Sequence, residues 1–141
     1  SSDLGTFSVF AKEYFRDLTL VEHNKAAIEF AKSNLEINGT SIKNSSFYGL
    51  SGETWVKIKG KNLTFDGIII DPPRTGIEKP VLQWICNSNT PVIKYVSCDP
   101  TTQARDAKFL LEAGYSMTEL YLLDFYPQSS HIETLACFIK N

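Results

Sequence analysis

The sequence predicts an α/β fold in which a doubly wound, mostly parallel sheet ends in an antiparallel hairpin. Strand-like and helix-like segments alternate along the chain, and their short connections favour right-handed crossovers. Residues 65–70 form an apolar run that stops at turn residues, as expected of a strand buried on both faces of a parallel sheet. The last two strand-like segments have no helix between them, so we expect them to pair antiparallel.

The first half of the chain predicts a strand, a helix, a second strand and a short helix. Residues 17–22 have the apolar content of a short strand. Asn24 can cap the helix that follows, and Gly39 is a suitable C-terminal stop for it. Residues 43–48 predict a weaker strand, and a short helix should begin within residues 51–55.

The second half predicts two further helices and three further strands. A helix over residues 78–87 is followed by a buried strand over residues 91–97. The next helix should end at Gly114, which is a common residue after a helix. Residues 115–125 and 131–139 then predict the two strands of the hairpin.

The helix before Gly114 has a clear start. Asp99 can accept hydrogen bonds as its cap, and Pro100 stands at the first helical position, where its missing N–H has no cost. The apolar spacing predicts that this helix turns three residues inward: Ala104, Ala107 and Leu111.

Length and composition indicate a single globular domain over residues 1–141. The chain is 43% hydrophobic and 21% charged, which excludes a disordered protein. It has no run of about 18 apolar residues, so we expect no membrane span, and no signal-peptide pattern at its start. Three cysteines without paired spacing predict neither a disulfide scaffold nor a metal site and suit the cytoplasm. The net charge of −2 predicts that this chain alone binds RNA weakly.

Three residues with chemical potential end predicted strands: Glu22, Asp71 and Cys98. Ligands of doubly wound sheets bind at the carboxyl ends of the strands. Glu22 is placed either to bind a nucleoside ribose or to be a solvated strand-end carboxylate. Pro72 and Pro73 force the chain out of the sheet and hold Asp71 at the strand tip, unless this is a rigid turn with an incidental acid.

Cys98 is the strongest candidate nucleophile. It lies between a strand and a helix N-terminus, where the helix dipole favours thiolate. Cys86 and Cys137 lie within predicted elements, so we interpret them as packing residues. His131 and Glu133 are two residues apart in an extended segment and would face the same side, as a base near Cys98 or as an ordinary polar strand face.

Four segments in order resemble one known family: residues 71–74 (DPPR), 95–106 (YVSCDPTTQARD), 123–127 (LDFYP) and 131–133 (HIE). From Gly5 to its end, the chain resembles the catalytic domain of the S-adenosylmethionine-dependent RNA (uracil-5)-methyltransferases, which act on tRNA or rRNA. The resemblance implies a Rossmann-like class I methyltransferase fold. It also implies an RNA substrate and no metal.

The resemblance implies roles for seven residues. Cys98 would be the nucleophile that adds to C6 of the uridine, and Glu133 would remove the C5 proton. S-adenosylmethionine would supply the methyl group. Its contacts would fall on Gly5, Thr6, Glu22, Ser51 and Asp71.

The family has a further strand before the glycine loop, between the strands that end at Glu22 and Asp71, and this sequence shows none. We therefore expect an N-terminally truncated fragment whose sheet has unpaired edges in its middle.

Three alternatives stay open. One is a weak or inactive fragment that binds RNA or protein. Another is a thiol hydrolase using Cys98, His131 and Glu133. The last is a methyltransferase of exocyclic amines, in which Cys98 has no role.

Overall fold

The computed structural model describes residues 14–39, 42–123 and 132–141. The chain divides into two compact units, Ser1–Lys59 and Gly60–Asn141, and each is described by itself. Within the described ranges no helix is both long enough and apolar enough to cross a membrane.

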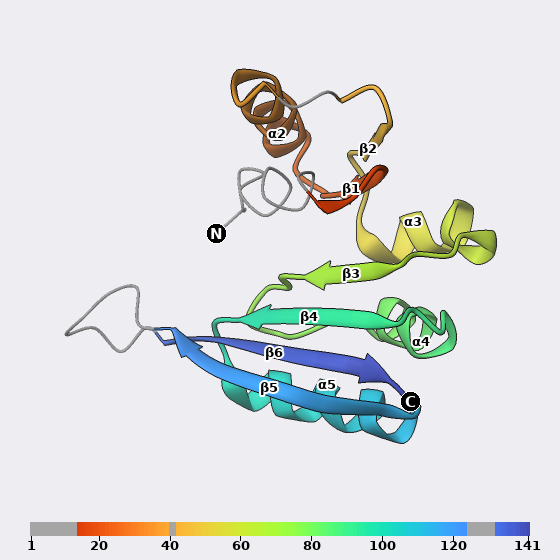
Figure 1. Cartoon of the computed structure of the whole chain (residues 1–141), viewed down its shortest axis with the longest axis vertical. Helices are drawn as coiled ribbons and strands as arrows, with labels where there is room; N and C mark the ends of the chain where they lie inside the picture. Colours follow the sequence, from red (N-terminus) through yellow and green to blue (C-terminus); the bar gives the residue numbers. More distant parts are fainter. Residues whose placement is uncertain (1–13, 40–41, 124–131) are drawn as a thin grey trace. The chain divides into compact units, whose positions relative to one another are not determined.

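Four elements alternate in the described part of the first unit: β1 (Leu18–Val21), α2 (Lys25–Ile37), β2 (Ser45–Tyr48) and α3 (Gly52–Ile58). The strands pair in parallel, with Leu18 opposite Ser45 and Val21 opposite Tyr48 (Figure 1). All four elements were predicted, and their bounds differ from the prediction by a few residues.

The start and end of α2 follow from single residues. Asn24 caps the helix as predicted, because its side-chain oxygen accepts hydrogen bonds from the N–H groups of Ala26 (3.0 Å) and Ala27 (3.4 Å). Gly39 follows the helix with a φ of 68°, a left-handed conformation that glycine adopts without strain. The buried face of the helix has the predicted spacing: Ala27, Ile28, Ala31 and Leu35.

The second unit is built on a four-stranded mixed sheet. Its elements are η1 (Gly60–Asn62), β3 (Gly67–Ile70), α4 (Lys79–Asn87), β4 (Val92–Ser97), α5 (Pro100–Glu112), β5 (Tyr115–Leu123) and β6 (Glu133–Lys140). The strand order is β3-β4-β6-β5 (Figure 1). β3 is parallel to β4, and β6 is antiparallel to both β4 and β5, which confirms the predicted hairpin.

The core of the second unit lies between this sheet and helices α4 and α5, which contact each other. Ile93 pairs with Phe138 and Tyr95 with Ala136, so these four side chains share one face of the sheet. They form one buried cluster with residues of both helices: Leu82, Ile85 and Leu110. Both helices therefore cover the same face.

The predicted inward face of α5 is wrong by one residue. The prediction placed Ala104, Ala107 and Leu111 inward. Ala107 is half-buried and packs against the core, but Ala104 is exposed and Leu111 is 48% exposed. The buried positions are Gln103, Asp106 and Leu110. Two of these side chains are polar and find hydrogen-bond partners inside the unit, a possibility that apolar spacing cannot reveal.

The described strands form two separate sheets. In the described part of the chain β1 pairs only with β2, and β3 pairs only with β4 along its length. β3 is less buried than predicted, and Ile69 is 43% exposed. It pairs with Lys94, on the face opposite to the one that α4 and α5 cover.

Candidate active site

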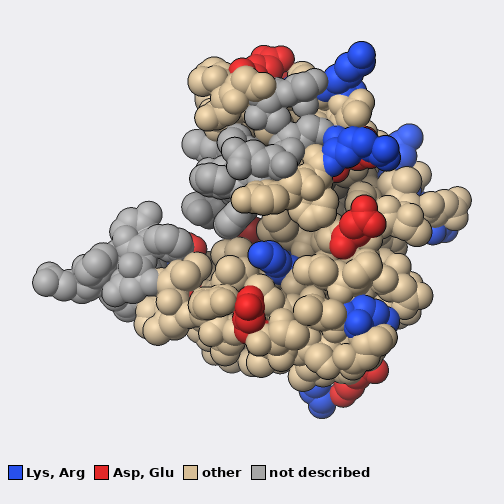
Figure 2. Space-filling view, in the orientation of Figure 1, with Lys and Arg blue, Asp and Glu red and all other residues tan. Residues whose placement is uncertain are grey.

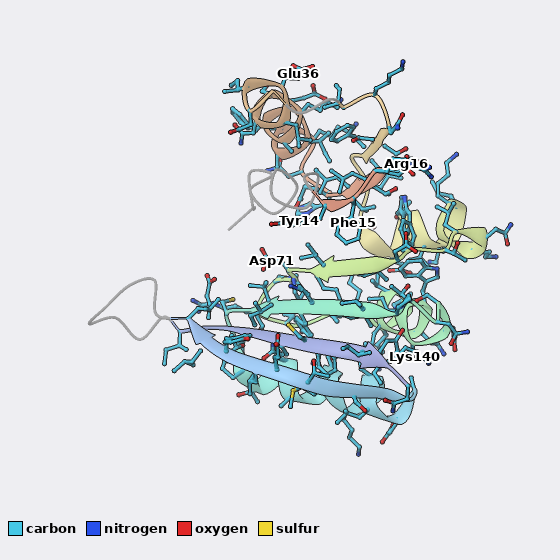
Figure 3. The ribbon with its side chains drawn as sticks, viewed as in Figure 1. Tyr14, Phe15, Arg16, Glu36, Asp71 and Lys140 are labelled. Atoms are coloured by element: carbon cyan, nitrogen blue, oxygen red, sulfur yellow. The ribbon has the colours of Figure 1, made fainter. Side chains whose placement is uncertain are left out.

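Three of the predicted site residues lie at one end of the four-stranded sheet. Asp71 follows the last residue of β3, Cys98 follows the last residue of β4, and Glu133 is the first residue of β6. The carboxyl ends of β3 and β4 and the start of β6 lie at the same end of the sheet (Figure 1). Asp71 is exposed and stands beyond the end of β3 (Figure 3).

The ladder between β4 and β6 brings Cys98 and Glu133 to matching positions. Its last pair is Ser97 opposite Thr134. Cys98 and Glu133 come one step beyond this pair, where β4 has ended and Cys98 lies in a bend. The register therefore brings both residues to the same end of the sheet.

Cys98 differs from the other two cysteines in its exposure. Cys98 is exposed, Cys86 is half-buried, and Cys137 is buried. Burial raises the pKa of the Cys86 thiol and of the Cys137 thiol above the ordinary range, and so favours the unreactive protonated form. The Sγ of Cys86 also donates to the carbonyl oxygen of Phe109 at 3.6 Å. These contacts agree with the prediction that Cys86 and Cys137 are packing residues.

The backbone around Cys98 is held on both sides. The hydroxyl of Ser97 accepts a hydrogen bond from the N–H of Asp99 (3.1 Å) and donates to its carbonyl oxygen (3.0 Å). The Asp99 carboxylate caps α5 as predicted, accepting from the N–H groups of Thr101 (2.9 Å) and Thr102 (3.2 Å). Cys98 is thus fixed between the end of a buried strand and the first turn of a helix.

Asp106 is the centre of a buried polar network that the sequence did not predict. Its carboxylate is 0% exposed and accepts hydrogen bonds from the Tyr95 hydroxyl (2.9 Å) and the Ile77 N–H (2.8 Å). Arg105 adds bonds from Nε (2.9 Å) and Nη2 (2.7 Å). Burial, together with the hydrogen bond to Asp106, raises the pKa of the Tyr95 phenol and keeps it a donor. The spacing of Asp106 from Leu110, one helical turn, was the available indication of a shared inward face.

Side chains of α5 also hold the loop that follows Asp71. Thr102 Oγ1 donates to the carbonyl oxygen of Arg74 at 3.1 Å, and Arg105 Nη2 donates to that of Thr75 at 3.0 Å. The helix that begins beside Cys98 therefore also holds the chain that follows Asp71.

Gly76 allows this close approach. Its φ is 83°, and a Cβ added there would stand 2.6 Å from Oδ2 of Asp106, against Nη2 of Arg105 as well. Any larger residue would push the loop away from the network.

Two other predicted residues lie in the first unit. Glu22 directly follows β1, its side chain is 25% exposed, and its Oε1 accepts from the Asn24 N–H at 2.8 Å and lies 2.9 Å from His23 Nδ1. Ser51 is the N-cap of α3, where its hydroxyl oxygen accepts from the Thr54 N–H at 3.2 Å. The structure thus gives Ser51 a capping role, and its expected contact with S-adenosylmethionine stays a prediction.

The remaining predicted positions lie outside the described residues. These are Gly5, Thr6 and His131, with residues 124–127 of the third matching segment. Within the described ranges no group of three or more His, Cys, Asp or Glu side chains could hold a metal ion. On the face that Figure 2 shows, the described Lys and Arg side chains form small groups separated by acidic and uncharged residues.

Known proteins share both the sequence and the fold. A family model described as tRNA (Uracil-5-)-methyltransferase matches residues 2–141. A protein of Treponema denticola described as an uncharacterized RNA methyltransferase is 46% identical over 151 residues, which cover 99% of this chain and 37% of that protein. The 23S rRNA (uracil(1939)-C(5))-methyltransferase of Psychromonas ingrahamii is 34% identical over 137 residues, 96% of this chain and 30% of the relative.

A solved structure gives the same result. The crystal structure of Pyrococcus abyssi tRNA (uracil-54, C5)-methyltransferase in complex with S-adenosyl-L-homocysteine matches 98% of this chain with a TM-score of 0.80 and 31% identity. The match covers 32% of that chain. The chain thus spans about a third of the length of the relatives it matches, at 37% and 30% for the two sequences above.

Proposed function

Because the chain belongs to the tRNA (uracil-5-)-methyltransferase family, we propose that it transfers a methyl group from S-adenosylmethionine to C5 of a uridine in tRNA or rRNA. The observation that supports this most directly is that the exposed Cys98 and Glu133 each lie one residue beyond the pair Ser97–Thr134, at the same end of the sheet. A nucleophile and a base at matching positions are what the reaction needs at the two adjacent carbons of the ring.

Cys98 acts first in the proposed reaction. Its thiolate adds to C6 of the uracil, and the electron pair of the C5–C6 double bond moves toward O4, which makes C5 nucleophilic. The target base must leave its stack to reach the thiol, at a cost of about a few kcal/mol. When bound, S-adenosylmethionine supplies the electrophilic methyl group that C5 takes.

Glu133 acts after methylation. Its carboxylate removes the proton that remains on C5, the C5–C6 double bond re-forms, and the bond between C6 and the Cys98 sulfur breaks. The thiolate is thereby regenerated, and the carboxylic acid returns its proton to solvent.

The carboxylates at the strand ends fit the cofactor. Asp71 is exposed beyond β3, and the Glu22 side chain is 25% exposed beyond β1. Both can accept hydrogen bonds from hydroxyl or amino groups of a nucleoside, at the end of the strands where such ligands bind. We assign both residues to cofactor binding, with Gly5, Thr6 and Ser51 as further contacts that the family resemblance implies.

The nucleophile is tested with RNA that contains 5-fluorouridine. The fluorine at C5 cannot be removed as a proton, so the complete gene product should form a covalent adduct that survives a denaturing gel. Cys98→Ala should abolish the adduct, and the matched control Cys86→Ala should retain it. Glu133→Gln should permit the attack but stall release from normal RNA. Methylation of uridine by an enzyme that forms no adduct would refute the proposal.

Cofactor binding is tested separately by calorimetry with S-adenosylmethionine. A hydrogen bond to a charged group contributes about 1.5–3 kcal/mol, so Asp71→Ala should weaken binding about tenfold to 100-fold. Asp66 is a matched control, because it is exposed and precedes β3 at the opposite end of the strand. Asp66→Ala should leave the affinity unchanged. Binding without turnover would favour the inactive fragment over the enzyme.

A further inference from the structure

We infer that Gln103 and Thr134 are positioning residues, and that the hydrogen bond between them holds Glu133 in register with Cys98 for the proton-removal step. The inference rests on the proposed function. It concerns two residues that touch neither the base nor the cofactor in that proposal, and whose side chains are each 5% exposed.

The contact joins the elements of both reacting groups. Thr134 directly follows Glu133 in β6, and its Oγ1 donates to Oε1 of Gln103 at 2.7 Å. Gln103 lies in the first turns of α5, the helix that begins two residues after Cys98, and its Nε2 donates to the carbonyl oxygen of Tyr95 at 2.9 Å. One side-chain amide therefore connects α5 to β4 and to the first residues of β6.

The chemistry of these two side chains suits a connection rather than packing. A glutamine offers a donor and an acceptor at once, and both are used here. Burying polar groups in a core costs free energy that an apolar residue of the same size would not cost. Leu or Met at position 103 would fill the same space beside Leu110. A requirement for a fixed position of β6 against α5 explains the glutamine.

The two reacting groups differ in how many supports they have. Cys98 is held by the Ser97 hydroxyl and by the capped start of α5, and both contacts persist without the Thr134 hydroxyl. Thr134 Oγ1 also lies 3.2 Å from the Ser97 carbonyl oxygen. Glu133 is the first residue of β6, and the bond from Thr134 to Gln103 is the side-chain link next to it. Loss of this link should therefore disturb Glu133 more than Cys98. A displacement of about 1 Å in an active site can cost about 100-fold in rate.

The test separates addition by Cys98 from proton removal by Glu133. Thr134→Val keeps the shape of the side chain but loses the hydroxyl. We expect its rate of adduct formation with 5-fluorouridine RNA to stay within about threefold of wild type, and its turnover of normal RNA to fall about tenfold to 100-fold. The methylated RNA should also accumulate as a covalent adduct on a denaturing gel, because release follows proton removal. Thr134→Ser keeps the hydroxyl and should restore turnover.

A second variant and a control complete the design. Gln103→Met should give the same split between adduct formation and turnover, and the double variant should lose less than the sum of the two single losses, because both variants remove the bond between Gln103 and Thr134. Thr118→Val is the matched control: Thr118 is an exposed threonine of β5 whose hydroxyl contacts the Cys137 carbonyl oxygen at 3.4 Å. If Thr134→Val does not fold, as judged by thermal melting, Gln103→Met decides the question.

The outcomes distinguish this inference from the proposed function. If the wild-type enzyme forms no adduct, the proposed function fails. If it forms the adduct, but Thr134→Val and Gln103→Met turn over as fast as Thr118→Val, the positioning inference is wrong and the proposed function stands. Equal losses in adduct formation and turnover would also overturn it, since that is the pattern of a general loss of structure.

Discussion

Replacing Asp106 with alanine should destabilise the second unit by about 3–5 kcal/mol, because the buried carboxylate accepts hydrogen bonds from buried donors that would lose their acceptor. Asp106 is 0% exposed and receives hydrogen bonds from three residues: Tyr95, Ile77 and Arg105. The substitution leaves the sheet, the helix and the loop after Asp71 without the group that joins them.

The magnitude follows from the donors that would lose their acceptor. The Tyr95 hydroxyl belongs to a residue that is 0% exposed and the Ile77 N–H to one that is 6% exposed. An unsatisfied buried donor costs about 1–3 kcal/mol, so the two together cost about 2–6 kcal/mol. The Arg105 side chain is 50% exposed. Water screens its charge, and its pairing adds about 1 kcal/mol at most.

The assay combines urea unfolding with hydrogen exchange at a single amide. Asp106→Ala should lower the free energy of unfolding by the amount above and should speed exchange of the Ile77 N–H, whose acceptor it removes. Tyr95→Phe is the matched control, because it loses one bond to Asp106 and leaves the Ile77 amide bonded; it should cost about 1–2 kcal/mol. A loss below about 1 kcal/mol in Asp106→Ala, or an unchanged Ile77 amide, would refute the reasoning.

Three further predictions concern glycine, tyrosine and cysteine residues. Gly76→Ala should lower the free energy of unfolding by more than about 1–2 kcal/mol, which is the cost of a left-handed φ alone, because the added Cβ also meets the Asp106 carboxylate. Gly39→Ala, with a φ of 68° and open space around it, should show the backbone cost alone in the same urea series. Because the pKa of Tyr95 is raised in the folded protein, its protonated phenol contributes to the free energy of unfolding. This contribution is complete below about pH 10, the pKa of tyrosine in the unfolded chain, and is lost as the pH rises above that value. Stability above about pH 10 should therefore fall less steeply in Tyr95→Phe. In native protein, iodoacetamide should modify Cys98 at least about tenfold faster than the two other cysteines, because access controls thiol reactivity. Mass spectrometry of timed samples would check this. Faster modification of Cys137 would contradict the observed burial.

Elements that depend on neighbours in sequence were predictable. Asn24 and Asp99 cap the helices expected of them, because a cap needs only its own side chain and the next N–H groups. The final hairpin was predictable for a similar reason, since two adjacent strands without a helix between them pair antiparallel. The positions of Asp71 and Cys98 at strand ends followed from the same local patterns.

The inward face of α5 was not predictable from apolar spacing. Gln103 and Asp106 are buried because their partners lie elsewhere in the chain: Asp106 accepts from Ile77, and Gln103 accepts from Thr134. A polar residue is stable inside a core only when such partners are in place. Their positions are known only once the chain is folded.

The sequence by itself determined the order of the elements, their caps and the kinds of side chain that stand at the strand ends, because these depend on neighbouring residues. Only the tertiary structure decided which of these positions lie at the same end of one sheet. Cys98 and Glu133 are far apart along the chain, and their common place depends on the register of β4 against β6, whose last pair is Ser97–Thr134. Register is set by packing on both faces of a sheet and by bonds between distant residues, and no local pattern contains that information.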